Sequence, residues 1–413
     1  MINNFLKITL RKILSNKINS IISVVGLALG ISSCLFITMY VFDELSYDNF
    51  HEKKDRIVRL TNRVKFSNED FHALTNLPTA ATVAKDFPEV ENFVRFRFSG
   101  QNGAELSYKN TVIKLPNVWF TDSTLFDVFT HDIINGEADQ ALNKPNSIVL
   151  TEKTTKQFFG NEDPIGREMK INNTVLTVTA VIANPPANTE IPINALISMT
   201  TFPQTFHDAF NQDWFRMGFY SFLLFKDKPN IPEFEKKMIA FEEKYIQPWA
   251  DVNEIEAKVT YYATLLKDVH FDSGKTYDLP KGNKNYIYIF SLLAIFILVI
   301  ASINYINLSL AQSNKRAKEI GVRKTLGAGK NELVLSFIGE SLILTILAVI
   351  LGIALVELWL GTFNGVTNKS LTTSAIFSGS NLLVLLGIIF IVGVLASSYP
   401  AFVLSSFNPS VVL

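Results

Sequence analysis

The residues best suited to chemistry are cations, and they gather in one stretch between two long apolar runs. Before Glu332, residues 311–330 contain a single acidic side chain, Glu319. Six basic side chains lie in the same stretch: Lys315, Arg316, Lys318, Arg323, Lys324 and Lys330. The chemistry that such a cluster offers is electrostatic, since its charges can pair with those of a partner surface.

The local sequence also predicts a short helix within this stretch. Ala317, Ile320 and Val322 favour one or two helical turns, and the glycines of residues 327–329 predict where those turns end. A short basic loop between two membrane spans is typical of the cytoplasmic side. The spacing alone leaves two interpretations open: a loop that only sets membrane topology, and a surface that binds a protein.

Four apolar runs must position this stretch. Each is about long enough to cross a bilayer, and they are residues 21–42, 286–310, 333–360 and 382–404. A basic N-terminal segment, residues 1–20, precedes the first run and places the N-terminus in the cytoplasm. A cleaved signal peptide would have a shorter apolar region and a small-residue cleavage site. We therefore predict an uncleaved first span.

This topology assigns the remaining segments to the two sides of the membrane. Residues 43–285 form a large extracytoplasmic domain, residues 361–381 form a short outer loop, and residues 405–413 form a cytoplasmic tail. Inside the first span, Gly26 and Gly30 have the spacing of a helix-packing motif, although such a pair is often only permissive.

The large domain is predicted to be α+β. Its strands are expected at residues 55–60, 93–98, 112–115, 147–151, 175–183 and 222–225, and its helices at residues 79–87, 152–159 and 231–245. Residues 93–98 alternate aromatic and basic side chains, a pattern also found in nucleic-acid binders. A half-buried strand is favoured, because no wider basic patch accompanies it.

Composition and missing motifs exclude several functions. Of the 413 residues, 48% are hydrophobic and 18% charged, with 38 basic and 38 acidic residues, so no nucleic-acid partner is expected. Cys34 is the single cysteine, which rules out a disulfide within the chain. No nucleotide-binding P-loop, His-Glu-x-x-His or Gly-x-Ser-x-Gly sequence occurs, so no catalytic, cofactor-binding or metal-binding residue is predicted.

Four polar residues interrupt the apolar runs. Asn304 and Asn307 lie near the cytoplasmic end of the second run, where amides can bond to neighbouring helices. Glu340 and Glu357 lie in the third run, and an acidic residue within a span is a functional candidate. Simple solvation near an interface is the favoured interpretation of both carboxylates.

The basic stretch also resembles a known family. Arg-x-Lys-Glu-Ile-Gly-Val-Arg-Lys-x-Leu-Gly-Ala, at residues 316–328, is similar to the loop after the second span of the FtsX/MacB family of ABC transporter permeases. In that family the loop carries the coupling helix, which docks on a cytoplasmic ATPase. The resemblance implies that Glu319 and Arg323 make the principal contacts. The implied coupling residues are Lys318, Glu319, Ile320, Gly321, Arg323, Lys324, Gly327 and Ala328.

The resemblance continues in other segments. Residues 87–91, 121–126, 142–152 and 159–166 are similar to the periplasmic domain of these permeases, especially Bacteroidetes-type members, and residues 398–409 are similar to the end of their four-span unit. The implied fold is an α-helical membrane protein with four transmembrane helices and a large, two-lobed α+β extracytoplasmic domain. The chain resembles a half-length permease, or the N-terminal portion of a longer one.

The function implied by this resemblance is mechanical. A separate ATPase binds ATP, pushes on the coupling loop, and the spans relay the movement to the periplasmic domain. The expected partners are that ATPase, a second permease unit (a homodimer or a fused half), membrane lipid and a periplasmic adaptor or outer-membrane component. The expected location is the bacterial inner membrane, with both termini in the cytoplasm.

The handled substrate is left open by the resemblance. Efflux or resistance to antimicrobial peptides or macrolides is the first expectation, with lipoprotein release and control of cell-wall hydrolases as alternatives. A second class of function is a membrane-anchored sensor or scaffold without an ATPase. A third class is a membrane-bound hydrolase, for which the sequence contains no motif.

Overall fold

The chain forms two compact units in the computed structural model. A helical unit comprises Met1–Leu45 and Lys284–Leu413, and a sheet domain comprises Ser46–Asn283. The structure describes residues 17–65, 69–100, 103–311, 322, 324–327, 329–395 and 398.

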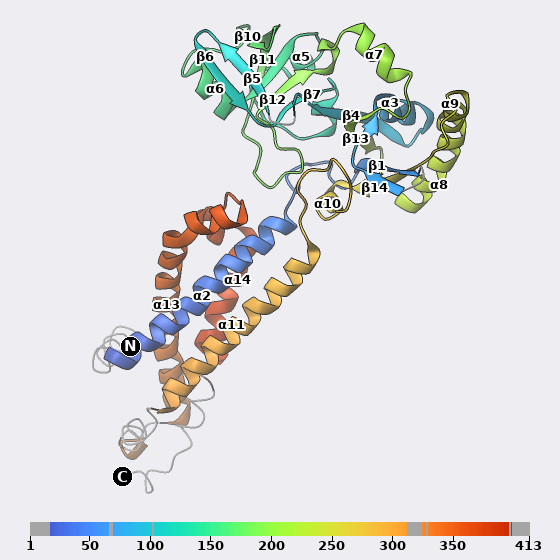
Figure 1. The fold of residues 1–413 in the computed structure, drawn as a ribbon. Helices are drawn as coiled ribbons and strands as arrows, with labels where there is room; N and C mark the ends of the chain where they lie inside the picture. The colour runs from blue at the N-terminus through green and yellow to red at the C-terminus, as the bar shows by residue number, and fades with distance from the viewer. Residues whose placement is uncertain are drawn as a thin grey trace. The chain divides into compact units, whose positions relative to one another are not determined.

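The described part of the sheet domain is built on one mixed, 14-stranded sheet (Figure 1). Its strands follow the order β14-β1-β13-β4-β7-β12-β9-β11-β10-β5-β6, with β2, β3 and β8 paired beside this path. The strand bounds are β1 (Ile57–Lys65), β2 (Glu69–His72), β3 (Thr75–Asn76), β4 (Val90–Phe98), β5 (Ala104–Tyr108), β6 (Thr111–Leu115), β7 (Val118–Thr121), β8 (Ile133–Gly136), β9 (Ser147–Thr151), β10 (Glu168–Ile171), β11 (Thr174–Ile182), β12 (Ala195–Ser198), β13 (Met217–Phe225) and β14 (Lys258–Leu265).

Short helices lie between these strands. Their bounds are α3 (Leu77–Asp86), α4 (Leu125–Val128), α5 (Ala138–Ala141), α6 (Glu152–Phe159), η1 (Met199–Thr201), α7 (Gln204–Asn211), α8 (Ile231–Phe241), η2 (Glu242–Ile246), α9 (Gln247–Val252) and α10 (Leu266–Val269). Local sequence sets the limits of α6. The Thr151 side chain accepts a hydrogen bond from the amide of Thr154 at its start, and Gly160, at φ +60°, ends it.

The apolar core of the sheet domain has three main parts. One packs α3 and α8 against β1, β13 and β14, and another packs α6 against β5, β9, β10 and β11. A third surrounds the fully buried Trp119 between them. Figure 1 accordingly shows β5, β6, β10 and α6 at one end of the domain, and β1, β14, α8 and α9 at the other.

The structure confirms the strands and helices that the sequence predicts in this domain. Residues 93–98 lie within β4, with Val94 and Phe96 buried, as expected for a half-buried strand. On either side of Pro164, Gly160 and Gly166 both have positive φ, a conformation that suits glycine in a tight connection. One helix differs, because α8 ends at Phe241 and continues as the π-helical turn η2 rather than as regular helix.

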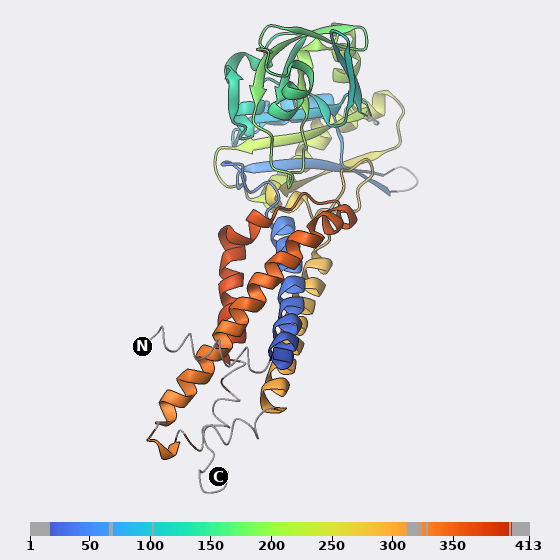
Figure 2. The same cartoon turned by 90° about the vertical axis from the view of Figure 1, so that its left-hand side faces the viewer.

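The helical unit contains α2 (Lys17–Leu45), α11 (Lys284–Ala311), α13 (Lys330–Thr367), η3 (Thr373–Phe377), α14 (Gly379–Phe390) and η4 (Ile391–Leu395) (Figure 2). Within the described residues, three helices are long and apolar enough to cross a membrane: Ser20–Leu45, Lys284–Ala311 and Asn331–Thr367. A shorter apolar helix, Gly379–Val394, occupies the first part of the expected fourth span. Residues 396, 397 and 399–404 of that span lie outside the described residues.

The helix α2 packs against both α11 and α13. Much of the surface of α11 is not covered by α2 and carries large apolar side chains. Ile289, Phe296 and Ile300 are each more than half exposed. A helix that is apolar all round is typical of a membrane span.

The span predicted at residues 333–360 lies within α13, which continues through Thr367 and ends where Asn368 adopts the left-handed conformation. One expectation for the acidic residues of this helix needs correction. Glu340 is only 8% exposed, so solvation does not explain this carboxylate. Glu357 is exposed and accepts a hydrogen bond from Thr373.

Candidate functional site

The basic stretch lies between α11 and α13. Six of the eight implied coupling residues lie outside the described residues: Lys318, Glu319, Ile320, Gly321, Arg323 and Ala328. Val322 and Lys324 have helical backbone, and the carbonyl of Lys324 accepts a hydrogen bond from the amide of Gly327. Gly327 has φ +92°, a conformation that suits glycine, so it ends the turn before α13 begins.

Gly26 and Gly30 both face α11. A Cβ added at Gly30 would lie 2.7 Å from the Cβ of Ala301, and one at Gly26 would lie 3.5 Å from Nδ2 of Asn304. The partner numbers fall as the α2 numbers rise, so the two helices are antiparallel at this contact. Only a residue without a side chain allows this approach at Gly30.

The end of α2 is bound to the segment that follows α13. Lys369 places its Nζ 2.7 Å from Oδ2 of Asp43 and also pairs with Glu44. Its ammonium lies 5.7 Å from the ring centre of Tyr40. This cation therefore compensates two neighbouring carboxylates at the end of α2.

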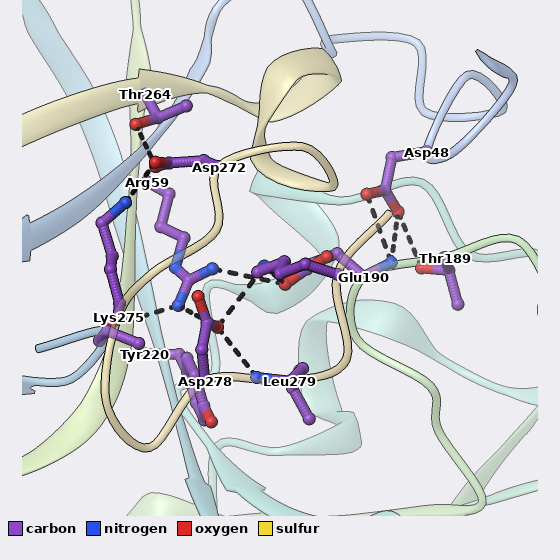
Figure 3. A network of polar contacts seen from close by, with 12 residues as sticks. Asp48, Arg59, Thr189, Glu190, Tyr220, Thr264, Asp272, Lys275, Asp278 and Leu279 are labelled. Carbon is purple, nitrogen blue, oxygen red and sulfur yellow. Dashed lines mark hydrogen bonds and ion pairs between the residues drawn. The ribbon is translucent and has the colours of Figure 1, made fainter. Parts of the chain in front are cut away.

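In the sheet domain, a network of buried charges surrounds Arg59 of β1 (Figure 3). Its guanidinium lies 2.7 Å from Oδ1 of Asp278 and 3.3 Å from Oε1 of Glu190. Lys281 pairs with Glu190 and lies 3.4 Å from Oδ1 of Asp278. Arg59 is fully buried and Glu190 is 3% exposed, so each charge depends on its partners.

Asp48, in the segment of the sheet domain that follows α2 in the sequence, extends this network. Its carboxylate accepts hydrogen bonds from the hydroxyl of Thr189, at 2.7 Å, and from the amide of Glu190, at 3.1 Å. Burial raises the pKa of Asp48 to about 6, although these two hydrogen bonds act in the opposite direction. Burial also raises the pKa of Glu190, against the lowering effect of Lys281 and Arg59.

Two histidines that are far apart in the sequence meet beside Asp48. The ring centres of His51 and His131 are 5.8 Å apart, and Nδ1 of His51 accepts a hydrogen bond from the amide of Thr130. Burial lowers the pKa of His51 to about 3 and that of His131 to about 4, so both rings are neutral at pH 7. Among the described residues, no group of three or more His, Cys, Asp or Glu side chains is placed to hold a metal ion.

Sequence reasoning misses this network. In the sequence, Asp48 is only an acidic residue shortly after the first span, and Arg59 is only a strand residue. One local signal is available, because Arg59 interrupts the apolar run Ile57-Val58-Arg59-Leu60, where a charge requires a buried partner.

Two family models match the chain. The model described as the MacB-like periplasmic core domain matches residues 20–241, and the model described as FtsX-like permease C-terminal matches residues 291–409. The first covers more than half of the chain. The second includes the whole basic stretch.

Curated relatives carry related names. A macrolide export ATP-binding/permease protein MacB from Bdellovibrio bacteriovorus is 24% identical over 65% of this chain and 39% of its own length. The protein of the same name from Pasteurella multocida is 23% identical over 61% of this chain and 36% of its own length. The chain thus spans about two fifths of the length of these relatives.

Among solved structures, a domain of a protein described as a permease, from Porphyromonas gingivalis, aligns with 58% of this chain and 98% of its own length, at 15% identity and a TM-score of 0.47. The two family models together account for both the sheet domain and the helical unit. The chain therefore belongs to the FtsX/MacB family of ABC transporter permeases.

Proposed function

We propose that this protein is the permease component of an ABC transporter that transmits movement across the membrane instead of conducting a substrate through a pore. One observation carries the proposal: a MacB-like core domain and an FtsX-like region occur in one chain, and the basic stretch lies inside the second. The chain belongs to a permease family, and no catalytic residue is invoked.

The proposed topology has four spans, at residues 21–42, 286–310, 333–360 and 382–404. The protein would lie in the inner membrane, with both termini in the cytoplasm. The three long apolar helices support the first three spans, and the shorter helix Gly379–Val394 supports the start of the fourth. The sheet domain would then lie on the periplasmic side, and residues 311–332 on the cytoplasmic side.

The proposed energy source is ATP bound by a partner ATPase, which docks on residues 318–328. Glu319 and Arg323 are the residues we assign to its principal ionic contacts, because opposite charges on its surface could pair with them. A second permease unit would complete the assembly, as a homodimer or a fused half. A periplasmic adaptor or outer-membrane component is a further proposed partner.

The proposed process is export from the periplasmic side, in the class of macrolide or antimicrobial-peptide resistance. The names of the curated relatives, which refer to macrolide export, support this class. This support is by analogy, because function depends on the residues of a site rather than on the fold that carries it.

Co-purification tests the ATPase contact. The tagged full chain would be isolated from its own membranes as the native sequence and as the variants Arg323→Glu and Glu319→Arg. Lys114→Glu, which reverses an exposed charge on β6 of the sheet domain, is the matched control.

We expect one ABC ATPase with the native chain and with Lys114→Glu, and a large loss with either reversal in the basic stretch. Reversal replaces attraction by repulsion at the contact, so a loss of about tenfold or more is expected. If no ATPase is recovered from the native chain even after crosslinking, the proposal is wrong, and a sensor or scaffold becomes the better explanation.

A further inference from the structure

The sheet domain is joined to the helical unit by two connections, residues 46–56 and 270–283. Neither contains a helix or a strand, and residues 46–56 are mostly turns. Segments of this kind would ordinarily absorb movement at one end without passing it on. Both connections, however, are anchored through buried charged side chains.

The first connection is anchored to the segment between β11 and β12. The amide of Asp48 donates to the carbonyl of Asn188, at 3.0 Å, and the Asn188 side chain donates to the hydroxyl of Ser46, at 2.8 Å. The Asp48 carboxylate accepts from the hydroxyl of Thr189 and from the amide of Glu190 (Figure 3). These hydrogen bonds fix the first residues after α2.

The second connection reaches the same segment from the other side. Lys281 pairs with the Glu190 carboxylate, and Asp278 binds the guanidinium of Arg59, which itself contacts Glu190. The backbone carbonyl of Tyr277 accepts a hydrogen bond from the hydroxyl of Tyr220 of β13, at 2.6 Å. Glu190 is thus bound through its amide by one connection and through its carboxylate by the other.

The two connections also contact each other directly. The rings of Tyr47 and His270 are stacked, with centres 3.4 Å apart and planes inclined by 11°. A displacement of either connection must therefore move Glu190, the other connection, or both.

We propose that Asp48, Arg59, Glu190, Asp278 and Lys281, the connection clamp, pass movement of the helical unit to the sheet. The inference rests on the proposed function, and it names the positioning residues through which the coupling acts. Separating any buried pair would leave an uncompensated charge, so the clamp resists deformation. Arg59 belongs to β1 and Glu190 precedes β12, so the clamp connects to two separate strands of the sheet.

The test compares balanced deletions of two ion pairs. Glu190→Gln with Lys281→Met removes one negative and one positive charge from the clamp. Arg95→Met with Asp122→Asn does the same at a pair with side chains 12% exposed, joined at 2.7 Å, which contacts neither connection. Asp48→Asn is a milder third variant that keeps an acceptor oxygen.

Each full-length variant would be studied in lipid nanodiscs, in complex with the ATPase that co-purifies with it. Amide hydrogen exchange would be compared with and without ATP, in α13 and in β12 and β13. In the native complex we expect ATP to change exchange in both units. Melting curves would show that each variant is folded.

The clamp double variant is Glu190→Gln with Lys281→Met. In it, we expect the ATP-dependent change in hydrogen exchange to persist in α13 and to fall about fivefold or more in β12 and β13. Asp48→Asn should give a smaller loss of the same kind, and the Arg95/Asp122 variant should behave like the native chain. Should the clamp double variant fail to fold, Asp48→Asn alone decides.

Three results would overturn the inference. The sheet could respond to ATP equally in the native and clamp variants, or the Arg95/Asp122 variant could lose the response as fully as the clamp variant. The native complex could also respond in α13 alone, which contradicts the clamp but leaves the ATPase contact intact. A native complex that responds to ATP in neither unit contradicts the proposed function itself.

Discussion

Glu242 is a carboxylate enclosed between η2 and β14 in the sheet domain. It is 6% exposed, and its Oε1 accepts a hydrogen bond from the amide of Tyr261, at 2.8 Å. Glu235 accepts in the same way from the amide of Ala263. Because β14 is at the end of the sheet path, these carboxylates satisfy backbone groups that would otherwise offer a free edge for pairing.

The acceptor at Glu242 makes stability depend on pH. Burial raises the pKa of Glu242 to about 7, from an ordinary value of 4.5. The folded state therefore binds the proton more tightly than the unfolded state, and the free energy of unfolding falls as pH rises from about 4.5 to about 7. Glu242→Gln keeps the acceptor oxygen and removes the charge.

We predict that Glu242→Gln raises the free energy of unfolding at pH 8 by about 1–2 kcal/mol. At pH 4, where the native carboxyl is protonated, the two proteins should agree, which is the internal control. Denaturant unfolding at both pH values measures the difference. Equal stability of native and variant chains at pH 8 would contradict the buried position of this carboxyl.

At the residue scale, the sequence predicted the end of the helical turn at Gly327 but not the connection clamp. A glycine with its neighbours is a local signal, as at Gly327. Arg59, by contrast, is 131 residues from Glu190 and 219 from Asp278, so only the completed fold brings them together. All eight coupling residues rest on the family resemblance, and their role in coupling remains a prediction.

Among the elements, α2 is packed on two sides by glycine-mediated contacts. Gly30 meets Ala301 of α11, and Gly352 of α13 would place a Cβ 3.3 Å from the backbone oxygen of Ala28. Close approach of helices through small residues is a main source of stability within a membrane, where the hydrophobic effect does not favour one helix contact over lipid.

This packing predicts that substitution by leucine has different effects on stability at two glycines. Gly30→Leu should force α2 and α11 apart and destabilise the helical unit by about 1–3 kcal/mol or more, as overpacking does. Gly361→Leu should have little effect, because no heavy atom lies within 4 Å of the added Cβ. Thermal melting in detergent measures both, and equal melting temperatures of the two variants would contradict the α2–α11 contact.

Element boundaries followed from the sequence where local signals were strong. The strand β9 and the helix α6 were predicted with the bounds that the structure has, because a buried apolar run leads directly into a capped helix. The strands β7 and β12 were missed, since each has four residues and no clear alternation. The helix α13 is longer than the span predicted within it, because a span is predicted from apolar residues alone and a helix can continue beyond them.

On the scale of the whole molecule, the two units have separate apolar cores. The core of the helical unit draws on α2, α11, α13 and α14, and the cores of the sheet domain draw on its own strands and helices. Only residues near 45 and 284 link them covalently. If the protein transmits movement, these two crossings must carry it, so the clamp and the basic stretch belong to one mechanism.

The central claim is that a partner ATPase contacts the basic stretch. Photo-crosslinking in native membranes tests this claim most directly. A photoreactive residue would replace Lys324, which lies in the described part of that stretch. A second variant would carry it at Val366, which is 78% exposed near the other end of α13.

We predict an adduct between position 324 and an ABC ATPase, identified by mass spectrometry, and none from position 366. An ATPase adduct from position 366 alone would contradict the proposed topology. No ATPase adduct from position 324, with the protein present and folded, would contradict the coupling itself.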